Sequence, residues 1–198
     1  MAKFSLPFNL QQWIDEHREL LKPPVCNKQI FEQDDYIVMV VGGPNNRSDF
    51  HYNETPELFY QLEGEMVLRV VNDDIDSAGE SNQKSYEQLR AEIAKSPNKA
   101  FEFTDIAIKA GDIFLLPPKV LHSPQRFEHS VGLVVEQKRA KGQQDALFWF
   151  CQHCKSPLYN EQFTLDNIET DLPQVFSNFY GNNENCQCKS CGHIAKKA

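Results

Sequence analysis

Short runs of β-branched and aromatic residues dominate the pattern of hydrophobic and polar positions from about residue 29 onward. Gly, Pro, Asn or Asp separates these runs, which read IFEQDDYIVMVVGG, LFYQLEG, EMVLRVVN, FEFTDIAI, GDIFLLPP and SVGLVVEQ. Many short strands with close turns, and no helices alternating between them, favour an antiparallel sandwich or barrel over a parallel α/β sheet. The pattern therefore predicts a mainly β protein.

Two segments interrupt this pattern with helical spacing. Residues 9–21 carry apolar side chains at helical intervals, and the prolines at 23 and 24 prevent the helix from continuing. Residues 73–100 form a polar, helix-prone stretch between two predicted strands. The apolar positions that could share one helix face in this stretch are Tyr86, Leu89 and Ile93. We therefore expect an N-terminal helix and a polar surface insertion.

Length and composition limit the number of domains. A chain of 198 residues is long enough for one well-buried domain with a small appendage, but short for two full domains. Hydrophobic residues make up 40% and charged residues 24%, which is ordinary for a globular protein. We expect a barrel over residues 1–140, which includes the insertion, and a C-terminal tail over residues 141–198 that begins near the polar segment KGQQD.

The charge of the chain excludes some partners. A net charge of −8 and a pI near 5.2 oppose attraction to nucleic-acid phosphates and to anionic membranes. The N-terminal segment has no apolar run of signal-peptide length, and nowhere do about 18 apolar residues follow one another. We expect a cytoplasmic protein with no nucleic-acid or membrane partner, in which local arginine or metal charge attracts any anionic substrate.

Two histidines and one glutamate have a spacing that suits a metal site. His51 and Glu57 lie in a strand, turn, strand context, and His122 ends the segment GDIFLLPPKVLH. Two imidazoles and one carboxylate on the walls of a barrel can occupy one face of a metal ion and leave the opposite positions open, as in non-haem iron(II) oxygenases. The alternative is ordinary core or surface polarity, which is the commoner role of a lone His–Glu pair.

These segments resemble the paired signature motifs of the cupin superfamily, in which the first motif supplies His and Glu ligands and the second supplies a further His. Two positions depart from the motifs, because Asn53 stands where a second histidine is usual and Lys119 stands where a glycine is expected. The resemblance implies a cupin (jelly-roll) β-barrel. Two imidazoles instead of three would suit an iron site with more open positions.

Two arginines flank the metal motifs. Arg47 lies four residues before His51, and Arg126 lies four residues after His122, so both could project towards the same barrel mouth. A guanidinium can hold a carboxylate through two parallel hydrogen bonds, which orients a planar substrate as well as binding it. The alternative is that both are exposed and only make the loops soluble.

Five segments together resemble the 3-hydroxyanthranilate 3,4-dioxygenase family, and they read LLKPPVCNKQIF, VVGGPNNRSDFHYN, ELFYQLEG, GDIFLLPPKVLHSPQRFE and LVVEQKR. The resemblance covers residues 7–72 and 101–191. It implies that catalytic iron(II) is bound by His51, Glu57 and His122. It also implies that Arg47 lies by the dioxygen and that Arg126 and Glu136 hold the substrate. A structural role for Glu136, in a salt bridge to a nearby Lys, is the alternative.

The resemblance further implies an oxidoreductase that adds both atoms of O2 to 3-hydroxyanthranilate, with Glu57 placed to take a substrate proton. The product, 2-amino-3-carboxymuconate semialdehyde, closes by itself to quinolinate, which links the kynurenine pathway to NAD (pyridine nucleotide) biosynthesis. One alternative is a cupin dioxygenase that acts on another small aromatic acid or on a thiol. The other is a non-enzymatic cupin that binds sugars or partner proteins.

Two C-x-x-C pairs stand near the C-terminus, separated by 33 residues. Their cysteines are Cys151, Cys154, Cys188 and Cys191. Four thiolates can enclose one metal ion tetrahedrally and stabilise a tail without a core of its own. Cys186, His153 or His193 could compete as ligands, and redox disulfides are a further alternative. The family resemblance implies a second, rubredoxin-like iron at these ligands, which zinc also fits, and a homodimer.

Overall fold

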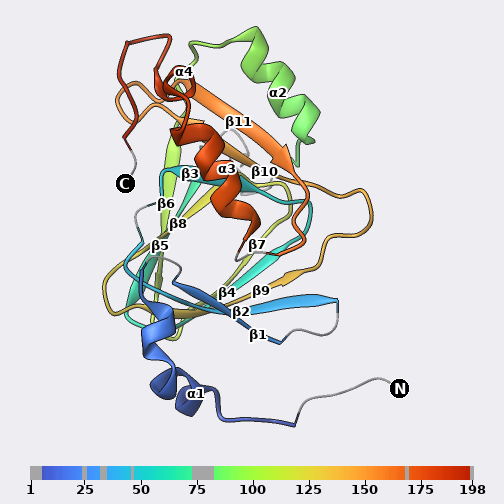
Figure 1. Cartoon of the computed structure of the whole chain (residues 1–198), viewed down its shortest axis with the longest axis vertical. Coiled ribbons are helices and arrows are strands. Elements are labelled where there is room, and N and C mark those ends of the chain that lie inside the picture. Colours follow the sequence, from blue (N-terminus) through green and yellow to red (C-terminus); the bar gives the residue numbers. More distant parts are fainter. Residues whose placement is uncertain are drawn as a thin grey trace.

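The computed structural model describes residues 6–23, 26–31, 35–45, 47–72, 83–167 and 170–196. It contains two antiparallel sheets that enclose a common interior (Figure 1). The first sheet has the order β1 (Asn27–Phe31), β2 (Tyr36–Gly42), β9 (Val131–Gln137), β4 (Glu57–Glu63) and β7 (Ile113–Leu116). The second has the order β11 (Pro157–Phe163), β10 (Asp145–Phe150), β3 (Asp49–Tyr52), β8 (His122–Arg126), β5 (Glu65–Val71) and β6 (Phe103–Lys109). The predicted mainly β, cupin-type barrel is confirmed.

The second sheet contains strands that the hydrophobic pattern did not predict. β3 and β8 are short and carry polar side chains, and all six residues of β10 are buried, so none of the three alternates between apolar and polar residues. β10 pairs with β3, and β11 pairs with β10. The second sheet therefore continues to Phe163. Residue 140, the expected end of the barrel, lies in the connection from β9 of the first sheet to β10 of the second.

Alternation of side chains along β3 explains how the barrel interior receives polar groups. Phe50 and Tyr52 belong to an aromatic cluster on one face of the second sheet, together with Phe148 and Phe150 of β10. Neighbouring residues on a strand point to opposite faces, so Asp49 and His51 face the interior between the sheets. The main apolar cluster, which includes Met39, Phe59, Leu68, Val134, Leu147 and Trp149, fills that interior around them.

The predicted N-terminal helix is present but shorter than its pattern. α1 (Leu10–Glu16) begins after the Asn9 cap, and a 3₁₀ helix, η1 (Arg18–Leu21), follows it. Ile14 and Leu21 pack against Val40 and Val131 of the first sheet. Leu20 of the same pattern is exposed, since the change to 3₁₀ geometry rotates it away from the core.

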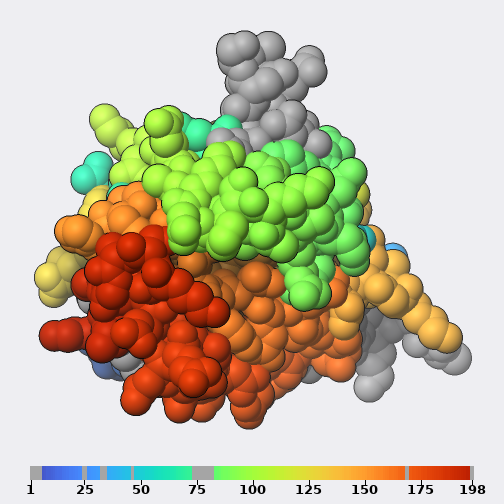
Figure 2. Space-filling model, turned by 90° about the horizontal axis from the view of Figure 1, so that it is seen from above, coloured from blue at the N-terminus to red at the C-terminus, as the bar shows by residue number. Residues whose placement is uncertain are grey.

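The insertion carries the expected helix, α2 (Tyr86–Lys95), with a capping box at Ser85. Its residues 73–82 lie outside the described part of the chain. Tyr86 and Leu89 are buried against the aromatic cluster of the second sheet, and Ile93 packs beside them. The predicted shared face is therefore confirmed. α1 and α2 lie at opposite ends of the molecule (Figure 1), and α2 lies beside the C-terminal segment (Figure 2).

Two further helices lie near the C-terminus, α3 (Asp171–Tyr180) and α4 (Asn183–Cys186). α3 packs onto the barrel through Phe179, whose ring stacks on Trp149 of β10 with 4.4 Å between centroids. The hydroxyl groups of Tyr180 and Ser48 lie 2.7 Å apart. These contacts hold the C-terminal segment against the second sheet of the barrel. Among the described residues, no helix has the length and apolar character needed to cross a membrane.

Candidate metal and substrate site

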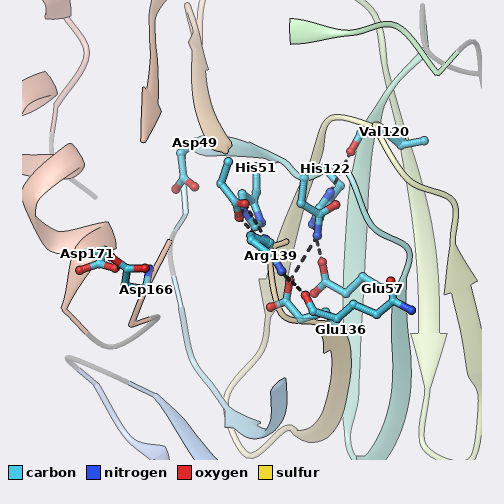
Figure 3. A network of polar contacts seen from close by, with 12 residues as sticks. Asp49, His51, Glu57, Val120, His122, Glu136, Arg139, Asp166 and Asp171 are labelled. Atoms are coloured by element: carbon cyan, nitrogen blue, oxygen red, sulfur yellow. Dashed lines mark hydrogen bonds and ion pairs between the residues drawn. The ribbon is translucent and has the colours of Figure 1, made fainter. Parts of the chain in front are cut away.

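The two histidines and the glutamate of the predicted metal site meet inside the barrel. His51 of β3 and His122 of β8 are direct cross-strand partners, and Glu57 begins β4 of the opposite sheet. Each residue offers one possible ligand atom, and these atoms lie within 4.8 Å of one another. All three side chains are buried. Figure 3 shows them gathered in one network of polar contacts.

The arrangement of these side chains fits a divalent cation. His122 Nδ1 lies 2.9 Å from the carbonyl oxygen of Val120, which leaves Nε2 facing Glu57 Oε2 at 3.0 Å. That carboxylate oxygen is buried but has no hydrogen-bond partner among the described residues. A buried carboxylate oxygen that faces an imidazole nitrogen without a hydrogen bond, with a second imidazole close by, offers the donor set that metals such as iron(II) bind.

Charge and burial oppose each other at this group. Burial raises the pKa of Glu57, but the neighbouring His122 and His51 together have a larger, opposite effect. The pKa of Glu57 therefore lies below its ordinary value. Burial lowers the pKa of His122, and the adjacent Glu57 carboxylate outweighs that effect and raises it. The carboxylate therefore remains charged, as a metal ligand must be.

One cavity connects the metal group with the other predicted site residues. It is lined by Asn27, Met39, Val41, Asn45, Arg47, His51, Glu57, Phe59, His122, Pro124, Arg126, Val134, Glu136 and Leu172. Every predicted catalytic, substrate-binding and barrel-metal residue is on this wall. The sequence motifs did not indicate the contributions of Asn27 from β1, Phe59 from β4 or Leu172 from α3, because single lining residues, polar or apolar, have no signature of their own.

Arg126 is a buried cation at this cavity. Its Nη1 donates to Gln61 Oε1 at 3.1 Å, and within the described chain no carboxylate forms an ion pair with it. Burial lowers the pKa of the guanidinium to about 10. A Cβ on Gly132 would lie 2.7 Å from Arg126 Nη1, so only glycine leaves room for the guanidinium there. A buried arginine without an acidic partner suits the binding of an anion.

The other two predicted substrate residues already have protein partners. Arg47 forms an ion pair with Asp49, and its side chain is 23% exposed. Glu136 forms a buried ion pair with Arg139 Nη1, at 2.6 Å, so its salt-bridge partner is an arginine and not the lysine considered above. Asn53 Nδ2 also lies 3.3 Å from Glu136 Oε2. Both charged groups are therefore held in place without a ligand.

The four cysteines of the C-x-x-C pairs form a second cluster. Their sulfur atoms lie within 4.8 Å of one another, with Cys151–Cys191 at 3.7 Å and Cys154–Cys188 at 3.5 Å. Sulfurs bound to one ion at about 2.3 Å stand about 3.8 Å apart in a tetrahedron, whereas a disulfide needs about 2.05 Å. Cys186 instead donates to the carbonyl of Phe179, and neither His153 nor His193 belongs to the cluster.

A two-sheet barrel with two imidazoles and one carboxylate inside defines a cupin-type barrel with a candidate metal site, here with an additional four-cysteine cluster. The family model described as 3-hydroxyanthranilic acid dioxygenase matches residues 3–180. The chain therefore belongs to the 3-hydroxyanthranilic acid dioxygenase family.

Individual relatives agree with this assignment. A 3-hydroxyanthranilate 3,4-dioxygenase of Xanthomonas euvesicatoria is 48% identical over 188 residues, which are 95% of this chain and 91% of that protein. One from Ruegeria pomeroyi is 45% identical over 195 residues, 98% of this chain and 93% of that protein. Among solved structures, a cupin-2 domain protein from Shewanella frigidimarina has a TM-score of 0.40 and 16% identity, covering 66% of this chain and 100% of that one. That likeness is too weak to bear on function.

Proposed function

We propose that this protein opens the aromatic ring of 3-hydroxyanthranilate with O2. The observation that carries the proposal is the cavity. There, a buried group of two histidines and one glutamate shares a wall with the buried guanidinium of Arg126, which forms no ion pair with a carboxylate of the described residues. Family membership and the names of the relatives point to the same substrate. In the reaction, the bond between the hydroxyl-bearing carbon and its unsubstituted neighbour breaks, and each of these carbons gains one oxygen atom from O2.

We propose iron(II) as the metal of the barrel, held by His51, Glu57 and His122. When bound, it would supply a Lewis acid for the substrate hydroxyl and the electrons that activate O2. Glu57 is placed to take the hydroxyl proton, because its carboxylate faces both the metal group and the cavity. Apolar side chains of Met39, Phe59 and Val134 line the same cavity and would exclude water from it.

The two arginines of the cavity would position the substrate and the O2. Arg126 would bind the substrate carboxylate through two hydrogen bonds, which fixes the ring in one orientation. Arg47 lies on the same cavity and would lie beside the O2. Glu136 would contact the substrate on the opposite wall, where Arg139 holds it. These roles rest on position, burial and charge in one cavity, and on the family resemblance.

Oxygen uptake tests the proposed reaction. The protein would be reconstituted anaerobically with iron(II), and 3-hydroxyanthranilate would then be added in air. We expect one O2 consumed per substrate, with the absorbance of the semialdehyde rising and then decaying as quinolinate forms. Uptake only with another ortho-hydroxylated aromatic acid would move the assignment to a different small aromatic substrate. If iron binds and no such acid consumes oxygen, the proposed reaction is wrong.

We propose a second metal ion, iron or zinc, at the four cysteines. A closed set of four thiolates leaves no position for substrate, so its role is structural or electron-transferring. The cluster joins residues next to β10 and β11 to the segment after α4, and so ties the C-terminal segment to the second sheet. Metal analysis of the purified protein distinguishes the two ions.

Since free thiolates persist in reducing compartments, we also propose a cytoplasmic location.

We propose a homodimer that uses the outer face of the first sheet. Tyr60, Ile113 and Leu115 are exposed there on the neighbouring strands β4 and β7. β7 is also an edge strand of its sheet. We expect Leu115→Glu to shift the protein from dimer to monomer in light scattering, whereas Leu20→Glu, also at an exposed leucine, leaves the mass unchanged. A monomeric native protein, or a variant that remains dimeric, would show that this face is not the interface.

A further inference from the structure

A buried chain of charged groups extends from His51 to Glu136. His51 Nε2 lies 2.6 Å from Asp145 Oδ2. Arg139 contacts both oxygens of that carboxylate, with Nε 2.6 Å from Oδ1 and Nη2 2.5 Å from Oδ2. The third guanidinium nitrogen, Nη1, lies 2.6 Å from Glu136 Oε2. Figure 3 shows Arg139 between the two histidines and Glu136.

All four side chains of this chain are almost completely withdrawn from solvent, with exposed fractions of 7% for His51, 1% for Asp145, 3% for Arg139 and 2% for Glu136. Burying two carboxylates and a guanidinium is costly unless each is paired with good geometry. Here every charge has a partner, so the arrangement is rigid. Charged side chains that only make a protein soluble lie on its surface, so solubility does not explain these buried charges.

We propose that Asp145 and Arg139 are positioning residues: Asp145 fixes the ring orientation and the proton of His51, and Arg139 holds Asp145 and Glu136 in one arrangement. The metal group and the substrate wall of the cavity are thereby aligned with each other. The inference rests on the proposed metal site and adds two residues that touch neither the metal nor the substrate.

The two nitrogens of an imidazole explain the role of Asp145. A neutral imidazole has one N–H and one lone pair, and a carboxylate next to one nitrogen places the proton there. With Nε2–H donating to Asp145, the lone pair of His51 is on Nδ1, where a metal ion can accept it. Histidine ligands generally donate their other N–H to a carboxylate or carbonyl, which orients the ring and increases its basicity. His122 follows the same rule through Val120.

Asp145 is an orienting group and not a fourth ligand. Its carboxylate does not belong to the group of possible ligand atoms that lie within 4.8 Å of one another. Both of its oxygens are occupied, Oδ1 by Arg139 and Oδ2 by Arg139 and His51.

Sheet register brings this network together. Leu147 of β10 is the cross-strand partner of His51, and Asp145, two residues before it on the same face, is a diagonal neighbour. The connection from β9 to β10 turns back at Gly142, whose φ of +90° favours glycine, and places Arg139 beside Asp145. The polar segment KGQQD (residues 141–145), which resembles a linker in the sequence, therefore ends in Asp145 and begins two residues after Arg139.

Metal affinity tests the proposal independently of catalysis. We expect Asp145→Asn to weaken iron(II) binding at the barrel by about 10- to 100-fold, as is usual when the carboxylate behind a histidine ligand is lost. The measurement is an anaerobic iron(II) titration against a competing chelator, on protein whose four-cysteine site is already loaded. Asp105→Asn is the matched control, because Asp105 also pairs with an arginine through both oxygens but is exposed. It should bind iron as the native protein does.

A triple variant separates positioning from charge balance. Asp145→Asn leaves Arg139 with one charged partner fewer, which lowers stability, whereas Asp145→Asn with Arg139→Gln and Glu136→Gln removes all three buried charges of the network. We expect the triple variant to regain thermal stability but not iron affinity. Native affinity in the folded single variant, or affinity restored in the triple variant, would overturn the proposal. Because the titration uses no substrate, failure of the proposed ring cleavage would leave this result interpretable.

Discussion

His122→Ala is expected to abolish ring cleavage while the barrel remains folded. The substitution removes one of the three side chains that meet at the candidate metal site, and it removes the imidazole nitrogen that lies 3.0 Å from Glu57 Oε2. A metal ion contributes several kcal/mol to such a reaction, and each 1.36 kcal/mol is a factor of ten, so activity should fall at least about 1,000-fold. Oxygen uptake with 3-hydroxyanthranilate measures this loss.

The fold should tolerate this change, because the strand pairing of β8 with β5 is made by the backbone. Circular dichroism and the iron content at the barrel therefore accompany the kinetics. His129→Ala is the control, since the His129 side chain is 90% exposed and pairs with Glu128, which is also exposed. Activity within tenfold of the native value in folded His122→Ala would show that this histidine is not a required ligand.

Arg126→Ala should weaken substrate binding by one or two powers of ten. Loss of a bidentate, charged pair with the substrate carboxylate is worth about 1.5 to 3 kcal/mol. The substrate-free protein should not suffer, because Arg126 is a buried cation without an acidic partner among the described residues and burial already disfavours its charge. KM for 3-hydroxyanthranilate, measured at saturating iron(II), is the appropriate quantity.

Two further variants sharpen this test. Gly132→Ala would place a Cβ 2.7 Å from Arg126 Nη1 and 2.9 Å from Gln61 Oε1, and so displace the guanidinium without removing it. It should raise KM in the same direction while iron binding stays native. Arg69→Ala removes an exposed arginine that pairs with Asp105 and should leave KM unchanged. Native kinetics in Arg126→Ala would remove this residue from the substrate site.

Local patterns in the sequence determined much of this protein. Six short runs of β-branched and aromatic residues predicted strands, including β2, β4 and β9, because turn residues separate each run from the next. The spacing of His51, Glu57 and His122 on short strand segments indicated one metal group, and the two C-x-x-C pairs indicated another. Such features depend on neighbours in the chain, which a single sequence displays directly.

Only the tertiary structure decided which distant residues meet. The hydrophobic pattern did not predict β3, β8 and β10, because strands buried on both faces or carrying site residues do not alternate. Their pairing brings Asp145 to His51 across 94 positions of sequence. Cross-strand register follows from the packing of the whole barrel and has no periodic signal along the chain. The candidate ligands could thus be read from the sequence, whereas the carboxylate and guanidinium behind them could not.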